Sequence, residues 1–406
     1  AVHRLSRRTV ASADSLPRPT EPAPGPGPGG GTRRWLGRAV LAAGAGAAVV
    51  AAVLAPADAG AAARQDWTPF VLVSGLLLLG LVARDDGLFD AAGDLMARTA
   101  AGSRSLFTAS AVLVAVVTAV LNLDTAVVFL TPVLVVAARR RGADAVPFLY
   151  LAVFLANGAS LLLPGSNLTN LIVLGGTHQS GRAFAAAMLP AWVAASVAVP
   201  AVLAVAFRRH LRANGPRPDR GARPRLGVGL AGVGAAVVAT LALSGAAMAG
   251  VVLGLGAAAV AVRLAQRRLV PGALSSTVDV PVLAGLFGLA VGLGALGRAW
   301  SGPEWLLAHA SSWQQAAIGA VTSVLCNNLP AASLLAARTV PDPKALLVGL
   351  NLGPNLAVTG ALSVVLWFGV SRPLGCRPSA ARYSRLGLAV VPISMAAALG
   401  ALALFH

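Results

Sequence analysis

Long apolar stretches, separated by short polar segments, run along nearly the whole chain. About 20 apolar residues are needed to cross the hydrocarbon core of a bilayer as a helix. Strict alternation of apolar and polar residues, which marks a membrane β-barrel, is absent. The pattern therefore predicts an all-α polytopic membrane protein. The apolar stretches cover about residues 36–56, 68–83, 105–138, 145–174, 186–206, 226–244, 246–265, 278–297, 311–338, 344–370 and 386–405.

Four of these stretches are interrupted near their middle by polar residues, Gly or Pro. Non-helical backbone at membrane depth is tolerated only where it is buried in protein or lines a cavity. We therefore expect two re-entrant hairpins, at 105–138 and 311–338, and two broken transmembrane helices, at 145–174 and 344–370. The interruptions read Asn122-Leu123-Asp124-Thr125, Pro164-Gly165-Ser166-Asn167, Asn327-Asn328-Leu329-Pro330 and Asn351-Leu352-Gly353-Pro354-Asn355.

The charges are few and strongly basic. Of the 406 residues 57% are hydrophobic and 11% charged, and the net charge is +18. In a soluble protein such an excess would indicate nucleic-acid binding. Here the arginines lie between apolar stretches, where positive charge is typical of the cytoplasmic side of a membrane. We therefore expect a lipid bilayer, and no nucleic acid, as the partner.

The arginine clusters also orient the chain. If both hairpins are re-entrant, every cluster falls on one side, which places the N-terminus in the cytoplasm and His406 outside. Hairpin, broken helix and span then follow in the same order in both halves, with the hairpins opening to opposite sides. This is an inverted-topology repeat, the architecture of alternating-access transporters, whose site lies where the breaks converge.

Four regions follow from this organisation. Residues 1–35 are basic and rich in Pro and Gly, which predicts a disordered cytoplasmic tail. Residues 36–206 form the first membrane repeat, 207–225 an Arg-rich cytoplasmic loop and 226–406 the second membrane repeat. The expected location is the cell (cytoplasmic) membrane. Only two cysteines are present, so no disulfide framework is implied.

Of the 14 acids, Asp124 alone is expected to lie deep inside an apolar stretch, beside Asn122 and Thr125. A carboxylate in the bilayer costs about 2.5 kcal/mol or more, so such residues usually serve a pathway or a proton relay. The alternative is a structural acid that neighbouring amides satisfy, or one in a wet vestibule. We expect Asp124 to bind the coupling ion.

The other candidate ligands are amides, hydroxyls and the glycines that let the backbone bend. They offer hydrogen bonds without fixed charge, although an asparagine at a break can also serve only as a helix N-cap. We expect the candidates of both halves to share one cavity. In the first half they are Asn157, Ser160, Gly165, Ser166, Asn167, Thr169 and Asn170; in the second, Asn327, Asn328, Asn351, Gly353, Asn355 and Thr359.

No phosphate-binding loop, zinc-ligand spacing or nucleophile elbow is found in the sequence. We therefore expect no cofactor, no metal site and no enzymatic activity. Cys326 could act as a soft ligand for a thiophilic solute, but a lone buried cysteine is commonly just a small apolar residue.

Five segments resemble the arsenical pump membrane protein family, a branch of the ion transporter superfamily that includes sodium/dicarboxylate carriers and sodium/proton antiporters. They keep the family's order over roughly residues 66–405. The segments are GLLLLGLVARDDGLFDAAGDLMAR from Gly75, NLDTAVVFLTPVLV from Asn122, ANGASLLLPGSNLTNLIVL from Ala156, CNNLPAASLL from Cys326 and NLGPNLAVTGALSVVLW from Asn351.

The resemblance implies a permease that exports arsenite or antimonite, coupled to protons or to a separate cytoplasmic ATPase. Asp124 matches the family's acid in the first hairpin. The other matching positions are Ser166, Asn167, Asn170, Asn327, Asn328, Pro330, Gly353, Pro354 and Gly360. The chain departs from the family at four positions: Leu123 replaces the usual asparagine, and Asn157, Asn351 and Asn355 stand where some members carry an acid, an acid and a lysine.

The leading functional hypothesis is therefore a secondary transporter that exports arsenite or antimonite, a small inorganic solute, in exchange for protons through Asp124. The alternative is another member of the superfamily: a sodium/proton antiporter, or a carrier of a carboxylate or other inorganic anion. A channel or a membrane enzyme is a third class; an enzyme would need a second catalytic group, and no His lies beside the breaks. The pattern leaves open whether sodium replaces the proton, whether the ATPase exists and whether the protein is a homodimer.

Overall fold

The computed structural model describes residues 29–175, 179–212, 227–269, 274 and 279–405. Within these ranges every regular element is helical and there is no strand. Seven of the described helices are long and apolar enough to cross a membrane, which confirms the all-α prediction. They are α1 (Gly29–Leu54), α2 (Pro56–Asp85), α4 (Ser103–Val120), α8 (Gly181–Ala206), α10 (Gly245–Ala265), α12 (Val280–Ala299) and α18 (Ala380–Phe405).

All four interrupted stretches are broken in the structure. The first becomes α4 and α5 (Leu123–Arg140), and the third becomes α14 (Ser312–Cys326) and α15 (Asn328–Leu335). The two broken helices carry 3₁₀ turns at their breaks. One consists of α6 (Ala145–Ala159), η1 (Pro164–Ser166) and α7 (Leu168–Leu174); the other consists of α16 (Pro343–Leu352), η3 (Gly353–Leu356), η4 (Val358–Gly360) and α17 (Leu362–Ser371).

An asparagine caps the helix that follows three of the four breaks. The side-chain oxygen of Asn122 accepts a hydrogen bond from Thr125 N at 2.8 Å, and that of Asn167 accepts one from Thr169 N at 3.2 Å. Asn327 accepts one from Leu329 N at 3.4 Å and has φ of 75°, a backbone conformation that costs a non-glycine residue about 1–3 kcal/mol. Each cap satisfies an N–H that the break leaves without a helical partner.

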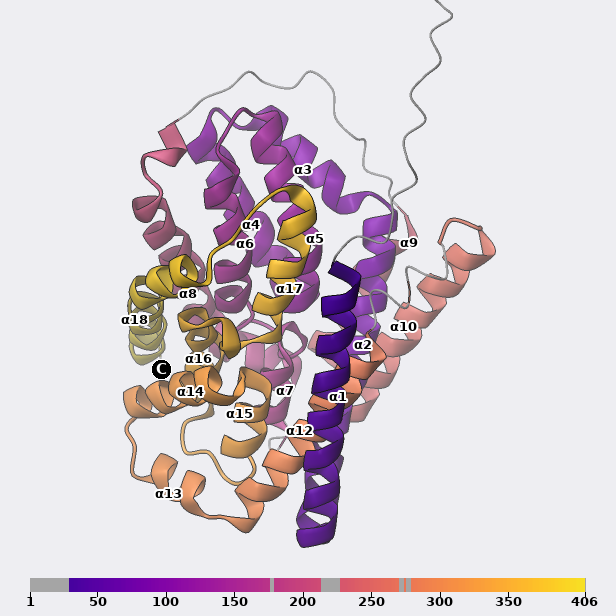
Figure 1. Ribbon diagram of the computed structural model, residues 1–406, viewed down its shortest axis with the longest axis vertical. Helices are drawn as coiled ribbons and strands as arrows, with labels where there is room; N and C mark the ends of the chain where they lie inside the picture. Colours follow the sequence, from indigo (N-terminus) through magenta and orange to yellow (C-terminus); the bar gives the residue numbers. More distant parts are fainter. Residues whose placement is uncertain (1–28, 176–178, 213–226, 270–273, 275–278, 406) are drawn as a thin grey trace, which may run out of the picture.

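The helices on either side of the first and third breaks fold back as hairpins. Arg141 Nη2 donates to Ala100 O at 2.8 Å, which joins the end of α5 to the start of α4. Asp342 N donates to Gln315 Oε1 at 3.0 Å, which joins the segment after α15 to the start of α14. Figure 1 places α4 and α5 in the upper half of the molecule, and α14 and α15 in the lower half. Their re-entry into a membrane from opposite sides stays a prediction.

The remaining long helices pack closely through small residues. A Cβ at Gly44 of α1 would lie 1.9 Å from Gly285 O of α12, so only glycine allows these two helices to approach so closely. α1 begins at Gly29, inside the stretch predicted as tail, and residues 1–28 and most of the predicted 207–225 loop lie outside the described residues. The short elements α3 (Leu88–Thr99), η2 (His210–Arg212), α9 (Val228–Ala242), α13 (Gly302–Ala308) and η5 (Arg372–Leu374) complete the described fold.

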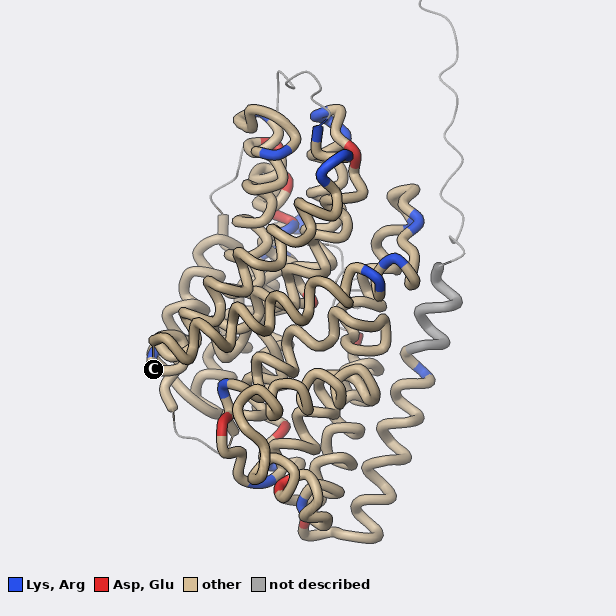
Figure 2. Tube along the Cα trace, turned by 90° about the vertical axis from the view of Figure 1, so that its left-hand side faces the viewer, with Lys and Arg blue, Asp and Glu red and all other residues tan. Residues whose placement is uncertain are grey.

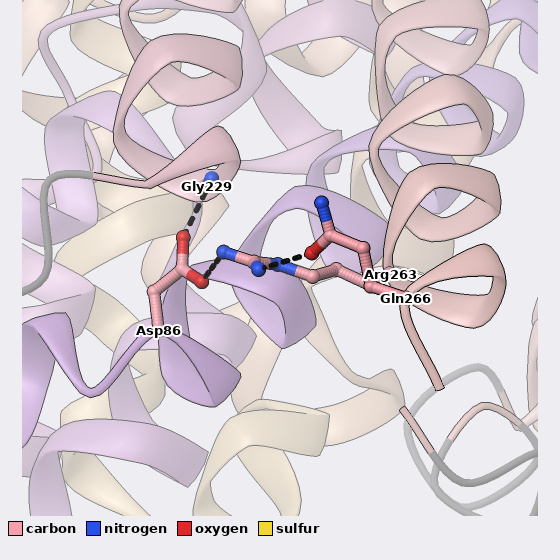
Figure 3. Close-up of polar contacts among 4 residues, drawn as sticks. All are labelled: Asp86, Gly229, Arg263 and Gln266. Atoms are coloured by element: carbon pink, nitrogen blue, oxygen red, sulfur yellow. Dashed lines mark hydrogen bonds and ion pairs between the residues drawn. The ribbon is translucent and has the colours of Figure 1, made fainter. Parts of the chain in front are cut away.

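Charged residues in the described part of the chain gather mostly towards the two ends of the long axis (Figure 2). One buried acid and one buried arginine of the described residues form an ion pair with each other. Asp86, at the end of α2, forms an ion pair with Arg263 of α10, and both side chains are almost fully buried (Figure 3). Asp86 also accepts a hydrogen bond from Gly229 N at 2.8 Å, while Arg263 donates to Gln266 at 2.7 Å. The pair therefore ties the ends of α2, α9 and α10 together.

Loss of this pair should destabilise the fold. Arg263→Leu leaves the Asp86 carboxylate buried without its cation, which typically costs about 3–5 kcal/mol. We expect a clear fall in the midpoint of thermal unfolding in detergent, with partial recovery in the double variant Arg263→Leu/Asp86→Asn. Arg268→Leu, at an exposed arginine of the same segment, serves as control. An unchanged midpoint for Arg263→Leu would contradict a structural role.

The predicted topology can be tested by labelling. Arg209, after α8, and Ser301, before α13, are both exposed in the structure and can each be replaced by cysteine. In a variant without native cysteines, a membrane-impermeant maleimide should label position 301 in intact cells and position 209 only in everted vesicles. Labelling of both positions from the same face would rule out the inverted repeat.

Candidate functional site

Asn351, at the end of α16, lies at the centre of a buried group of amides and hydroxyls. Its Oδ1 accepts hydrogen bonds from Ser160 Oγ and Asn167 Nδ2, both at 2.6 Å. Its Nδ2 donates to Asn170 Oδ1 at 3.0 Å and to Leu347 O at 2.8 Å. One residue of the second half thus bonds three residues at the break of the first half.

Asn355, in η3, makes the second link between the halves. Asn157 Nδ2 donates to Asn355 Oδ1 at 2.9 Å, and Asn355 Nδ2 donates to Phe154 O at 3.0 Å. We use the term amide cluster for Asn157, Ser160, Ser166, Asn167, Asn170, Asn351 and Asn355, all of which are buried. The two broken helices therefore meet at their breaks.

The break of the first half is also held internally. Ser166 Oγ donates to the carbonyl oxygens of Ser160 and Leu163, each at 2.6 Å. Asn170 Nδ2 donates to Ser160 O at 2.7 Å and to Leu163 O at 3.1 Å. These bonds satisfy carbonyls that the end of α6 leaves free. Thr169 Oγ1, by contrast, is buried without a hydrogen-bond partner among the described residues.

Two side chains outside the predicted set also form hydrogen bonds with the cluster. Tyr383 of α18 donates to Asn355 Oδ1 or Pro354 O, each at 3.2 Å, and Ser363 Oγ of α17 donates to Asn157 Oδ1 at 3.4 Å. Neither residue lies in a polar interruption of an apolar stretch, which is the feature that predicted the cluster residues. Tyr383 is one of only two tyrosines in the chain, and this was the only available hint.

The candidates on the hairpins form no hydrogen bond with the amide cluster among the described residues. Asn122 caps α5, and Thr125 packs its methyl group against the α2 backbone at Gly80. Asp124 is half-buried, with no hydrogen bond or ion pair among the described residues. The first hairpin tip therefore presents a free carboxylate.

The tip of the second hairpin meets the second broken helix instead. Asn327 Nδ2 donates to Thr359 O at 3.5 Å, and Thr359 Oγ1 donates to Val324 O at 2.8 Å, while Asn328 is buried. Gly353 is required here because a Cβ on it would lie 2.4 Å from Ala320 Cα of α14.

The glycine at the first break is less tightly held. A Cβ on Gly165 would lie 3.2 Å from side-chain atoms of Leu72 and Leu76, so the break packs against α2. By their hydrogen bonds, the residues predicted to share one cavity thus divide into the amide cluster and two hairpin tips.

Asp124 is not the only acid within an apolar helix, contrary to the sequence-based expectation. Asp66 of α2 is 2% exposed, and its Oδ1 has no hydrogen-bond partner among the described residues. It lies near Arg298 of α12 and Ser333 of α15. The apolar stretch begins only at about residue 68, but the alanine-rich segment before it continues the same helix and carries Asp66 inside. The alanine-rich sequence before residue 68 was the feature that could have revealed the burial of Asp66.

The amide cluster offers donors and acceptors but no charge. In this structure the side chains satisfy one another, so the cluster is closed. If the two broken helices separated, the same groups would face a polar solute and replace part of its hydration. The described residues contain no group of three or more metal-ligating side chains. The chemistry of the cluster is therefore reversible hydrogen bonding.

Comparisons with known proteins point to transport. A family model described as a citrate transporter, CitMHS, matches residues 32–362. The arsenical pump membrane proteins of Escherichia coli (strain K12) and Shigella flexneri are each 30% identical to this chain over 175 residues. This match covers 42% of the chain and 41% of each relative, so it spans well under half of their length. It confirms the resemblance inferred from the motifs.

The fold also resembles a solved transporter. The crystal structure of the YdaH transporter of Alcanivorax borkumensis, described as having an unusual topology, aligns with a TM-score of 0.50. The alignment covers 84% of this chain and 85% of that one, at 17% sequence identity. At this identity the likeness concerns the fold alone.

Asn351 should be the residue on which the cluster depends most. Asn351→Ala removes the acceptor of Ser160 and Asn167 and the donor to Asn170, and each buried group left unsatisfied costs about 1–3 kcal/mol. We expect transport to fall at least about tenfold and the thermal midpoint to drop.

Two further variants separate this effect from general damage. Asn351→Asp keeps the oxygen that accepts from Ser160 and Asn167 but loses the amide donor to Asn170, and should retain more activity than the alanine variant. Ser394→Ala removes a buried hydroxyl that bonds only carbonyls of its own helix, and should leave transport unchanged. Full transport by Asn351→Ala would show that the cluster is only structural.

Proposed function

The chain belongs to the CitMHS family of citrate transporters, and from this premise we propose that it is a secondary active transporter whose solute binds between the two broken helices. The observation that carries the proposal is the direct bonding of Asn351, in one half, to Ser160, Asn167 and Asn170 in the other. A solute that replaces these bonds would couple its own binding to the relative position of the halves. Such coupling is what alternating access requires.

The chemistry of the cluster favours a small, uncharged oxyacid as the solute. Seven amides and hydroxyls converge there without a cation or an anion among them. Arsenite and antimonite are mostly neutral at neutral pH, so they can form hydrogen bonds without an ionic partner. The similarity to proteins named arsenical pump membrane proteins supports this choice. Efflux of arsenite or antimonite is therefore the leading candidate.

Transport of a carboxylate is the second candidate. The family model that covers residues 32–362 is described as a citrate transporter. A carboxylate could accept hydrogen bonds from the Nδ2 groups of Asn157, Asn167 and Asn351 once these groups exchange their present partners. Uptake assays in everted vesicles, with arsenite, citrate and sodium tested with and without a pH gradient, distinguish the two candidates. Accumulation of none of these solutes would contradict both.

The proposed coupling residue is Asp124. It lies at a hairpin tip, is half-buried and has no partner among the described residues, so its proton can exchange with whichever side has access. Desolvation disfavours a charged carboxylate, which makes protonation at such a position accessible. Proton binding at Asp124 would then change the cost of moving the hairpin through the bilayer.

Asp124→Asn tests this role. The amide keeps the size and hydrogen-bonding capacity of the side chain but cannot titrate. We expect the variant to insert and fold, to lose transport driven by a pH gradient by about tenfold or more, and to retain solute exchange without a gradient. Asp90→Asn, at an exposed acid of α3, should transport normally. Full gradient-driven transport by Asp124→Asn would assign Asp124 a structural role only.

A further inference from the structure

A cavity of about 380 Å³ lies at the predicted cytoplasmic end of the molecule, away from the amide cluster. Its walls come from the end of α5, the start of α6 and the segment that leads into α18. Three arginines line it: Arg139, Arg377 and Arg382. A volume of this size is typical of a small-molecule site.

The positive charge of this cavity is not neutralised by its own walls. Among the described lining residues Asp144 is the one acid, and both of its oxygens are engaged. Its Oδ1 accepts from Val146 N at 2.9 Å, and its Oδ2 lies 2.6 Å from Nδ1 of His210. Arg377 has no hydrogen bond or ion pair within the described part of the chain.

The other two guanidinium groups are held in place by uncharged partners. Arg139 Nη2 donates to Leu374 O at 2.7 Å. The Arg382 guanidinium carbon lies 5.9 Å from the centre of the Tyr150 ring and 5.3 Å from that of Phe207. Stacking of this kind orients an arginine while leaving its N–H donors free for a planar oxyanion. The cavity thus contains two arginines held in a fixed orientation, Arg139 and Arg382, and one arginine without a partner among the described residues, Arg377.

Helix termini add to the positive potential. The first residues of α6, Ala145 and Val146, line the cavity, and so does Ser379, which precedes α18. Both helices are long, with 15 and 26 residues, and their N-terminal ends carry partial positive charge. The dipoles therefore act in the same direction as the arginines.

The cavity is connected to the amide cluster along two helices. On α6, Tyr150 lines the cavity and Asn157 belongs to the cluster, seven residues or roughly 10 Å further along the helix. On α18, Arg382 lines the cavity, and its chain neighbour Tyr383 donates to Asn355 or Pro354. An occupant of the cavity would thus contact two helices that continue into the cluster.

We propose that Arg139, Arg377 and Arg382 form an oxyanion-binding vestibule, which takes a carboxylate or phosphate group at the predicted cytoplasmic end of the path to the amide cluster. The site is separate from the proposed solute site and does not depend on the identity of the transported solute. The oxyanion is either a soluble anion or the phosphate of an anionic lipid headgroup. Both sources share the chemistry that the three guanidinium groups recognise.

Cys376 provides a native reporter, since its thiol lines the cavity and lies 3.5 Å from Arg139 Nη2. The rate of its alkylation by iodoacetamide can be followed by peptide mass spectrometry in phosphatidylcholine nanodiscs. The probes are citrate and inorganic phosphate, compared with chloride at the same ionic strength. A second set of nanodiscs contains phosphatidylglycerol. Cys326, outside the cavity, is the internal reference.

We expect citrate or phosphate to slow alkylation of Cys376 but not of Cys326 if the oxyanion is soluble. If it is a lipid headgroup, phosphatidylglycerol should do so without added anion. Arg377→Gln should weaken the protection about tenfold, as expected for the loss of one charge-assisted hydrogen bond, and Arg377→Lys should weaken it less. Arg372→Gln removes the same charge from an exposed neighbour outside the cavity and should change nothing.

Two results would overturn the proposal. One is an unchanged Cys376 rate with citrate, phosphate and phosphatidylglycerol alike. The other is equal protection in wild type and Arg377→Gln, which would show a nonspecific effect of anions. The assay needs no transport, so a vestibule without arsenite or citrate transport would refute the proposed function alone.

Discussion

Each interrupted helix in this protein leaves backbone N–H and C=O groups that lipid cannot satisfy, and the arrangement of the candidate site depends on how the chain satisfies them. Asparagine caps the helix that follows three of the breaks. At the first broken helix the capping residue Asn167 also donates to Asn351 in the other half. The same side chain therefore stabilises the break and joins the halves, so the structural and functional interpretations of Asn167 are compatible.

The distribution of charge separates two environments along the proposed path. The amide cluster is buried and uncharged, so its bonds can exchange with a polar solute without separating an ion pair. The arginine-lined cavity near the surface is cationic and partly open to water. A buried ion pair such as Asp86–Arg263 fixes helix ends rigidly, whereas the amides can form alternative bonds at lower cost.

Asp124 and Asp66 differ from the uncharged cluster and from the buried ion pair, since each has a carboxylate oxygen without a partner among the described residues. Asp124 is on the first hairpin, whereas Asp66, on α2, lies near Ser333 of α15 in the second hairpin. An ionisable group at membrane depth is costly enough that it usually serves a function. Asp124 has the greater access to water, which makes it the better candidate for proton exchange.

The sequence by itself determined the helices, their breaks and the transporter class, because long apolar stretches in a bilayer have few alternatives to a helix and because Asn, Gly and Pro interrupt helices locally. Only the tertiary structure decided which of these residues meet. Asn351 bonds Asn167, while Asn327 and Thr359 pair elsewhere, and Asp66 and Tyr383 prove to be buried beside the core. Such pairings depend on how each helix is rotated and packed against its neighbours, which follows from contacts between distant parts of the chain and cannot be obtained from any local pattern.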